Sequence, residues 1–323
     1  MAVPIVYLDQ NHWIALARAS LGRSTDTACL DALAIIEATA RRGLAVFPLS
    51  GAHYIETHRQ HDPERRARLA TFMLRISRGW TISDENAVRH EIAVALAEAF
   101  PGRIAVPPLN LLGHGVWHAG NQAKPLLEDS LPSLANLPPA TRAIVEPWAE
   151  SLIEWVLLSG VSPDPSYLSP QPELIFPTRF ADGLVDFRQR YQQTPAAQRD
   201  DLIYARTLMD LQEPIGETVL QNGLSADDVT LEEGRWKGLV DSMPTRRVQV
   251  QLHRQWVRNP NLTATHSTLN DWHYLGVAAC YADLLVTEKL FADLVSRDGF
   301  RVRAEIVTNL RDLPAALAQL TRV

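Results

Sequence analysis

Residues 269–289 read Leu-Asn-Asp-Trp-His-Tyr-Leu-Gly-Val-Ala-Ala-Cys-Tyr-Ala-Asp-Leu-Leu-Val-Thr-Glu-Lys. Apolar and small residues recur at helical spacing in the first part of this stretch, and a short apolar run at residues 284–287 ends in a polar residue. The pattern predicts a helix followed by a strand. Asp271 would then lie in the first turn of the helix and Asp283 between helix and strand. Glu288 would follow the carboxyl end of the strand, where open α/β sheets bind ligands.

Further acidic residues follow predicted strands near the start of the chain. Residues 3–8 form a compact apolar strand that runs directly into Asp9. A second predicted strand, residues 44–47, leads into a helix that contains Glu56. Strands that alternate with helices favour a parallel sheet with right-handed crossovers. The sequence therefore predicts an α/β protein with carboxylates at three strand-to-helix junctions.

In their order and positions, these motifs resemble the PIN-domain nucleases, which are metal-dependent enzymes that include the toxins of many bacterial toxin-antitoxin pairs. Asp9-Gln10-Asn11 resembles the motif with which that family ends its first strand. Residues 50–56, which begin with Ser and end with Glu, resemble its second motif. Asp271 and the later Leu285-Val286-Thr287 resemble its third. The resemblance covers roughly the first sixty and the last sixty residues.

Many members of the family carry a fourth acid two residues after the Thr, and this chain has Lys289 at that position. Asp283 and Glu288 are the alternatives for the fourth role. The resemblance implies a set of carboxylate metal ligands: Asp9, Glu56, Asp271 and Asp283. These four and Glu288 are the expected catalytic residues. Hard oxygen ligands suit Mg²⁺ or Mn²⁺, which would activate water for hydrolysis of a phosphodiester bond.

Five other residues are candidates for substrate binding: Asn11, Thr287, Lys289, Arg254 and Arg258. Arg254 and Arg258 lie on a predicted helix that also carries Trp256, and such a surface can hold phosphates and stack a base. Plainer interpretations stay open for these residues. Asn11 could cap the helix that follows it, and the arginines could face solvent while Val248, Val250, Leu252 and Trp256 pack in the core.

The middle of the chain has few predicted strands. We expect residues 1–60 and 262–323 to form a PIN-like core, a parallel sheet flanked by helices, which is interrupted by a large and mainly helical insertion at residues 61–261. Within the insertion, residues 107–139 contain many Gly and Pro residues and are predicted to be loop. The insertion could bind substrate or a protein partner.

The composition limits the classes of function. A net charge of −6 over 323 residues argues against general affinity for polyanions, so nucleic acid would have to bind a local basic patch. Two cysteines, Cys29 and Cys280, exclude a disulfide framework and a four-thiolate zinc site. No segment approaches the roughly 18 apolar residues of a membrane span, and the start of the chain lacks a signal-peptide pattern. We expect a cytoplasmic protein that does not enter membranes.

The sequence therefore predicts a metal-dependent endonuclease. An endoribonuclease that cleaves single-stranded or structured RNA is preferred because of the family resemblance, which also implies a bacterial toxin or defence effector with a regulatory protein partner or a homo-oligomeric state. One alternative is a phosphatase of the haloacid-dehalogenase type, although that class usually has a second Asp where this chain has Asn11. The other alternative is a non-catalytic PIN-like binding or regulatory module.

Overall fold

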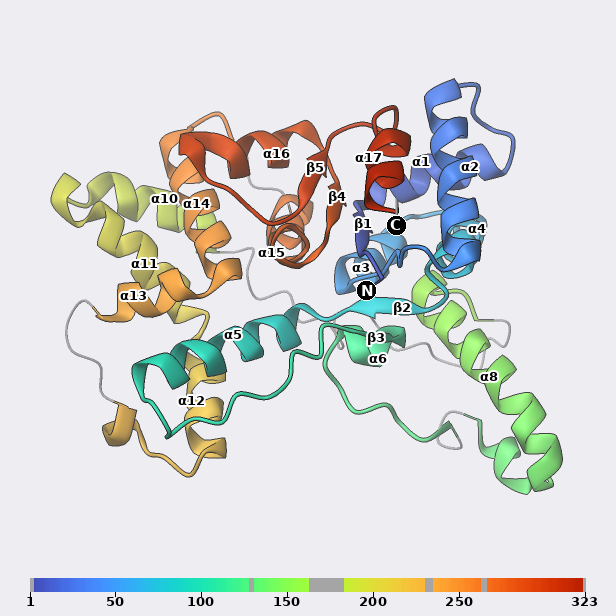
Figure 1. The fold of residues 1–323 in the computed structure, drawn as a ribbon, viewed down its shortest axis with the longest axis horizontal. Coiled ribbons are helices and arrows are strands. Elements are labelled where there is room, and N and C mark those ends of the chain that lie inside the picture. The colour runs from blue at the N-terminus through green and yellow to red at the C-terminus, as the bar shows by residue number, and fades with distance from the viewer. Residues whose placement is uncertain (1–2, 128–130, 163–182, 230–234, 263–265, 322–323) are drawn as a thin grey trace. The chain divides into compact units, whose positions relative to one another are not determined.

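The chain is a mixed α/β protein in which helices predominate (Figure 1). The computed structural model describes residues 3–127, 131–162, 183–229, 235–262 and 266–321. Contacts divide the chain into two compact units, each built from separate segments. Unit 1 comprises Met1–Ser83, Leu112–Pro177 and Asn309–Val323, and unit 2 comprises Asp84–Leu111 and Thr178–Thr308. None of the helices in the described part of the chain combines the length and the apolar composition of a membrane span.

Unit 1 begins with a short strand that is followed by four helices and a second short strand. Its elements are β1 (Val6–Leu8), α1 (Gln10–Ser20), α2 (Thr27–Arg42), α3 (Gly51–His58), α4 (Pro63–Ser77), β2 (Trp80–Ile82), β3 (Leu112–His114), α6 (Gly115–Ala119), the 3-10 helix η1 (Pro132–Asn136), α8 (Pro139–Ser159) and α17 (Leu313–Leu320). Helix α1 contacts α2, α3 and α4. The expected alternation is therefore present only in part, because four helices separate β1 from β2.

The predicted strand at residues 44–47 is wrong in its extent. This segment makes two isolated parallel bridges, one between Ile5 and Val46 and one between Leu49 and Thr81. Pro48 lies between the two bridges and has no backbone N–H to donate to a ladder. The segment therefore connects the regions of β1 and β2 in parallel without forming a continuous strand of its own.

The predicted loop at residues 107–139 is also wrong in part. It contains β3, α6 and η1, and β3 pairs with β2 in antiparallel register. Thr81 Oγ1 donates a hydrogen bond to the carbonyl of Gly115 at 3.1 Å, and the rings of Trp80 and His114 lie 4.0 Å apart. These contacts join residues more than thirty positions apart, so a local reading of Gly and Pro content could not reveal them.

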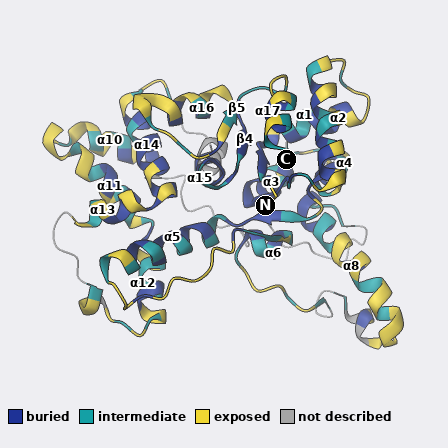
Figure 2. Cartoon of the chain, in the orientation of Figure 1, coloured by how far each residue is buried: buried dark blue, intermediate teal, exposed yellow. Residues whose placement is uncertain are grey.

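Helix α8 belongs to unit 1, although it lies within the predicted insertion. It contacts α3 and α4, and Leu157 accepts a hydrogen bond at its carbonyl from His58 Nε2 at 2.7 Å. Arg66 Nε donates to the carbonyl of Ser159 at 2.8 Å. Figure 2 shows that the other end of α8 is largely exposed. The division into units therefore places its boundaries elsewhere than at residues 60 and 262.

Unit 2 is mainly helical. Its elements are α5 (Asp84–Ala99), α10 (Gly183–Gln193), η2 (Ala196–Gln198), α11 (Arg199–Met209), α12 (Gln212–Gln221), η3 (Ala226–Val229), α13 (Arg235–Ser242), α14 (Pro244–Arg258), α15 (His266–Tyr281), β4 (Leu284–Val286), α16 (Lys289–Ser296), η4 (Arg297–Gly299) and β5 (Glu305–Val307). Strands β4 and β5 pair in parallel with Leu285 opposite Ile306. Strand β4 lies within the strand predicted at residues 284–287.

Helix α14 lies in the core of unit 2 (Figure 2). It contacts α11, α13, α15 and α16. Its apolar side chains are buried: Val248, Val250, Leu252 and Trp256. The ring of Trp256 meets that of Trp272 on α15 edge-on at 5.6 Å, so it cannot stack a base. The plainer interpretation of the apolar face of this helix is confirmed.

Candidate functional site

Asp9 ends β1 and caps α1. Its carboxylate Oδ1 accepts a hydrogen bond from the N–H of Gln10 at 2.6 Å, and its carbonyl accepts from His12 and Trp13. The helix therefore begins at Gln10, and the alternative in which Asn11 caps it is wrong because Asn11 is the second helical residue. Asp9 is nearly buried, with 9% of its surface exposed. An acid at this position stabilises the helix start whatever its chemical role.

Two side chains of α3 hold the residues on either side of Asp9. His53 Nδ1 accepts from the N–H of Ser50 at 2.8 Å, so its proton lies on Nε2, which donates to the carbonyl of Leu8 at 2.9 Å. The amide of Gln10 donates to Thr57 Oγ1 at 3.1 Å. These bonds fix the first predicted motif against the second. Burial lowers the pKa of His53 to about 4, opposed by its bond to Leu8, so its imidazole is neutral near pH 7.

Glu56 and Asn11 line the same pocket in unit 1. The pocket has a volume of about 580 Å³ and lies between α1, α3 and α4. Glu56 is half-buried and is the single carboxylate among the residues that line it. Two motifs that lie 45 residues apart in the sequence thus contribute polar side chains to one concave surface.

Four arginines line this pocket, and the sequence prediction included none of them: Arg18, Arg23, Arg65 and Arg68. Arg18 lies on the face of α1 that also carries Asn11, since the two residues are seven positions apart. Gly22 follows α1 with a φ of 67° and turns the chain back. The N–H of Arg23 then donates to the carbonyl of Arg18 at 2.9 Å, which closes the end of the helix and keeps the two residues together.

Arg65 and Arg68 come from the first turns of α4. Asp62 caps this helix by accepting from the N–H of Glu64 at 2.9 Å. The same Asp62 pairs with Arg65 at 3.1 Å, and Glu64 pairs with Arg68 at 3.2 Å. Both pairs lie near solvent and contribute little to stability. The sequence did hold a signal for part of this lining. Asn11, Ile14 and Arg18 recur at helical spacing on one face, and Leu21-Gly22 marks the end of that helix.

The other predicted acids lie in unit 2. Asp271 is part of α15, but its side chain falls outside the described residues. Asp283 follows the end of α15, as predicted, and its Oδ1 accepts from Arg303 Nη2 at 2.9 Å. Glu288 is exposed and precedes α16 as its N-cap residue. The structure therefore gives Asp283 an ion pair and Glu288 a position at a helix start.

Thr287 and Lys289 differ in their exposure. Thr287 is fully buried, and its N–H donates to the carbonyl of Val307 at 3.0 Å, which extends the pairing of β4 with β5. Lys289 is exposed in the first turn of α16. The hydroxyl of a buried Thr cannot reach a substrate without a change in its surroundings, whereas the Lys ammonium can.

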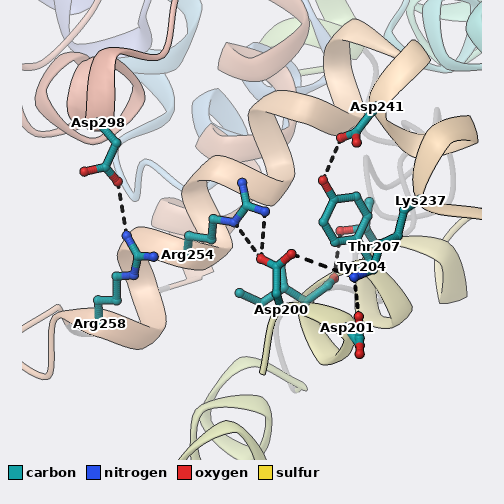
Figure 3. A network of polar contacts seen from close by, with 10 residues as sticks. Asp200, Asp201, Tyr204, Thr207, Lys237, Asp241, Arg254, Arg258 and Asp298 are labelled. Atoms are coloured by element: carbon teal, nitrogen blue, oxygen red, sulfur yellow. Dashed lines mark hydrogen bonds and ion pairs between the residues drawn. The ribbon is translucent and has the colours of Figure 1, made fainter. Parts of the chain in front are cut away.

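Arg254 and Arg258 are both paired with carboxylates of unit 2 (Figure 3). Arg254 donates to Asp200 Oδ1 through Nε at 3.1 Å and through Nη2 at 2.7 Å. Arg258 donates to Asp298 Oδ2 at 3.1 Å. These residues line an open pocket of about 700 Å³ together with further arginines: Arg247 and Arg301. Cations and carboxylates are therefore mixed on this surface.

The described residues contain no group of three or more His, Cys, Asp or Glu side chains that could hold a metal ion. The chemistry of the donors in unit 1 nevertheless suits a hard cation, because Asp9 and Glu56 are carboxylates and Asn11 has an amide oxygen. The ligand roles of Asp271 and Asp283 stay predictions from the sequence. No protein-family model, curated protein or solved structure matches the chain.

Proposed function

We propose that the protein is a metal-dependent endonuclease, and most specifically an endoribonuclease. The observation that carries this proposal is that Asn11 and Glu56, which come from separate motifs, line one pocket. Four arginines line the same pocket. Hydrolysis of a phosphodiester requires a carboxylate-rich centre and cations that hold a charged backbone. The pocket of unit 1 supplies the cations and one carboxylate, that of Glu56. The preference for RNA over DNA rests on the family resemblance.

Asp9 and Glu56 are the carboxylates of unit 1 that would hold Mg²⁺ or Mn²⁺. A bound cation would supply an activated water and neutralise charge on the phosphoryl group. Asn11 lies on the first turn of α1 beside Asp9 and can orient a phosphate or a water through its amide. The hydrogen bonds from His53 and Gln10 hold the segment around Asp9 in place, so these residues act as positioning residues.

A non-catalytic polynucleotide-binding protein is the second candidate. It is favoured by the engagement of two predicted acids in ordinary structural contacts. Asp9 caps α1, and Asp283 pairs with Arg303. Binding by the arginine-lined pocket would not require either acid. The two candidates therefore differ in whether a metal and Asp9 are needed for chemistry.

The test is cleavage of mixed single-stranded RNA and DNA by the purified protein in Mg²⁺, in Mn²⁺ and in chelator. The Asp9→Asn variant is measured in parallel, because Asn also caps helices well and preserves the fold. We expect cleavage of RNA that requires both the metal and Asp9. Cleavage that persists in chelator or in the variant would contradict the proposed mechanism. Binding of RNA without any cleavage would support the second candidate.

A further inference from the structure

The pocket between α1, α3 and α4 has a strongly cationic lining in an acidic protein. Four arginines line it against the one carboxylate of Glu56, whereas the chain as a whole carries a net charge of −6. Three helices contribute to this lining, so it is a concave surface and not a single exposed helix face. A local concentration of positive charge of this kind attracts anions even when the whole protein repels them.

Arg18 and Arg23 are the cations best placed to bind an anion. Both are exposed, and among the described residues no carboxylate forms an ion pair with either of them. Arg18 also lies in the last turn of α1, where a cation stabilises the helix dipole by a few tenths of a kcal/mol, but Arg23 lies beyond the helix and gains nothing from that effect. The turn at Gly22 therefore brings a second guanidinium to the pocket without a structural need for it.

Arg65 and Arg68 can add to the same surface. Their pairs with Asp62 and Glu64 are between neighbours on α4, and the side chain of Glu64 is 79% exposed. Such pairs exchange readily with other anions because water screens them. A guanidinium can also donate to a phosphate oxygen while it keeps a contact with a carboxylate.

The pocket has no platform for stacking a base. Among the described residues that line it there is no Trp, Tyr or Phe, and the apolar part of the lining is aliphatic. It does contain two amides with unused hydrogen-bonding atoms. Gln10 is 4% exposed, and its Oε1 has no hydrogen-bond partner in the described part of the chain. Gln60 Nε2 likewise has no hydrogen-bond partner there. Both atoms are buried, so neither reaches a substrate without a change in its surroundings.

We propose that this pocket binds consecutive phosphates of a polynucleotide strand through Arg18, Arg23, Arg65 and Arg68, and that it does so without reading the bases. The inference rests on the proposed function, because it assigns this surface to the substrate of the nuclease. It makes Arg18 and Arg23 binding residues and predicts affinity that depends on the sugar-phosphate backbone and on salt.

The test measures binding in chelator, so that it does not depend on cleavage. The affinity of a short single-stranded RNA is determined between about 50 and 200 mM salt for the wild type and for the double variant Arg18→Ala/Arg23→Ala. The matched control is Arg41→Ala/Arg42→Ala, which removes two exposed arginines of the same unit from the end of α2, outside the pocket. Melting temperatures check that both variants are folded.

We expect the pocket variant to bind about tenfold more weakly and the slope of log K against log salt to become shallower by about 1.4, the value for two lost phosphate contacts with a single strand. The control should stay within about twofold of the wild type. An unchanged slope in the pocket variant, or an equal loss in the control, would remove the pocket from the binding surface. Cleavage by the wild type would be untouched by that result, so the two proposals can fail separately.

A second arm distinguishes the backbone from other sources of affinity. An abasic oligonucleotide should bind with an affinity within about threefold of that of a DNA strand of the same length that carries its bases. It should show the same loss of affinity for the Arg18→Ala/Arg23→Ala variant. Inorganic phosphate should compete only weakly, because it offers one phosphate and not several in a row. Loss of binding on removal of the bases would overturn the inference, as would full competition by phosphate at the concentration of the oligonucleotide.

Discussion

The imidazole of His53 donates through Nε2 to the carbonyl of Leu8 at 2.9 Å, and its Nδ1 accepts from the N–H of Ser50 at 2.8 Å. The ring is buried, and it links the first turn of α3 to the end of β1. This arrangement needs one particular neutral tautomer, because a proton on Nδ1 would face the N–H of Ser50. His53 therefore makes a pH-dependent contact with Leu8, the residue before Asp9.

We expect the stability of the protein to fall in mild acid because of His53. Burial lowers its pKa to about 4 in the folded protein, while the unfolded chain takes up the proton near its ordinary value of 6.5. The contribution of His53 is therefore fully present above pH 6.5 and is lost as the pH falls through about 4. The measurement is urea denaturation over this range for the wild type and for His53→Gln, which does not titrate.

The variant should be less stable at pH 7 by about 1 to 2 kcal/mol, because an amide cannot reproduce both hydrogen bonds. The difference between the two proteins should shrink as the pH falls. A constant difference from neutral pH to pH 4 would show that His53 is not the group responsible.

We expect the effect of Glu154 on the pH dependence of stability to be opposite to that of His53. Burial raises the pKa of this carboxyl, opposed by hydrogen bonds from the Tyr54 hydroxyl and the N–H of Val116. The folded state therefore keeps the proton longer than the unfolded state does. The contribution of Glu154 is fully present below its ordinary value of 4.5 and is lost as the pH rises through the raised pKa.

Replacement by Glu154→Gln removes the titration and keeps an acceptor of the same shape. In the same denaturation series, we expect the stability of the variant to increase relative to that of the wild type as the pH rises above 4.5. Parallel stability curves for the two proteins would contradict the assignment of this pH dependence to Glu154.

Asp9 has a structural and a proposed chemical role, and two substitutions separate them. Asp9→Ala removes the cap of α1 and should cost about 1 kcal/mol of stability, whereas Asp9→Asn should change it by only a few tenths. Both variants should lose cleavage if the carboxylate holds the metal. Denaturation and cleavage are measured on the same preparations. Retained activity in Asp9→Asn would leave Asp9 as a helix cap alone.

Local patterns in the sequence were sufficient for many elements of the fold. The apolar run at residues 284–287 predicted β4, and Asp62 followed by Pro63 is the kind of local pattern at which a helix such as α4 begins. These signals act over a few residues, through capping, proline geometry and hydrophobic periodicity. Strands β2 and β3 depend on pairing across more than thirty residues, and nothing in the local sequence distinguishes them from loop.

The candidate pocket shows the same limit. Motif order led to Asn11 and Glu56, and the structure places both on one concave surface. No local pattern groups the arginines, since Arg18 and Arg23 lie at and after the end of α1 while Arg65 and Arg68 lie near the start of α4. The packing of α4 against α1, which is a tertiary fact, brings them to one pocket.

We expect the basic surfaces of the two units to contribute differently to RNA binding. Arg254 and Arg258 are each engaged by an aspartate, Asp200 and Asp298, so a phosphate must compete with a carboxylate for each of them. We expect Arg254→Ala/Arg258→Ala to weaken RNA binding by less than about threefold and to change the salt slope less than Arg18→Ala/Arg23→Ala does. The loss of two partly exposed ion pairs should cost at most about 1 kcal/mol each. The measurement is the salt titration in chelator with all three proteins side by side. A larger loss of affinity and slope in the Arg254/Arg258 variant would instead make α14 the principal RNA-binding element, because only phosphate contacts release counterions in proportion to their number.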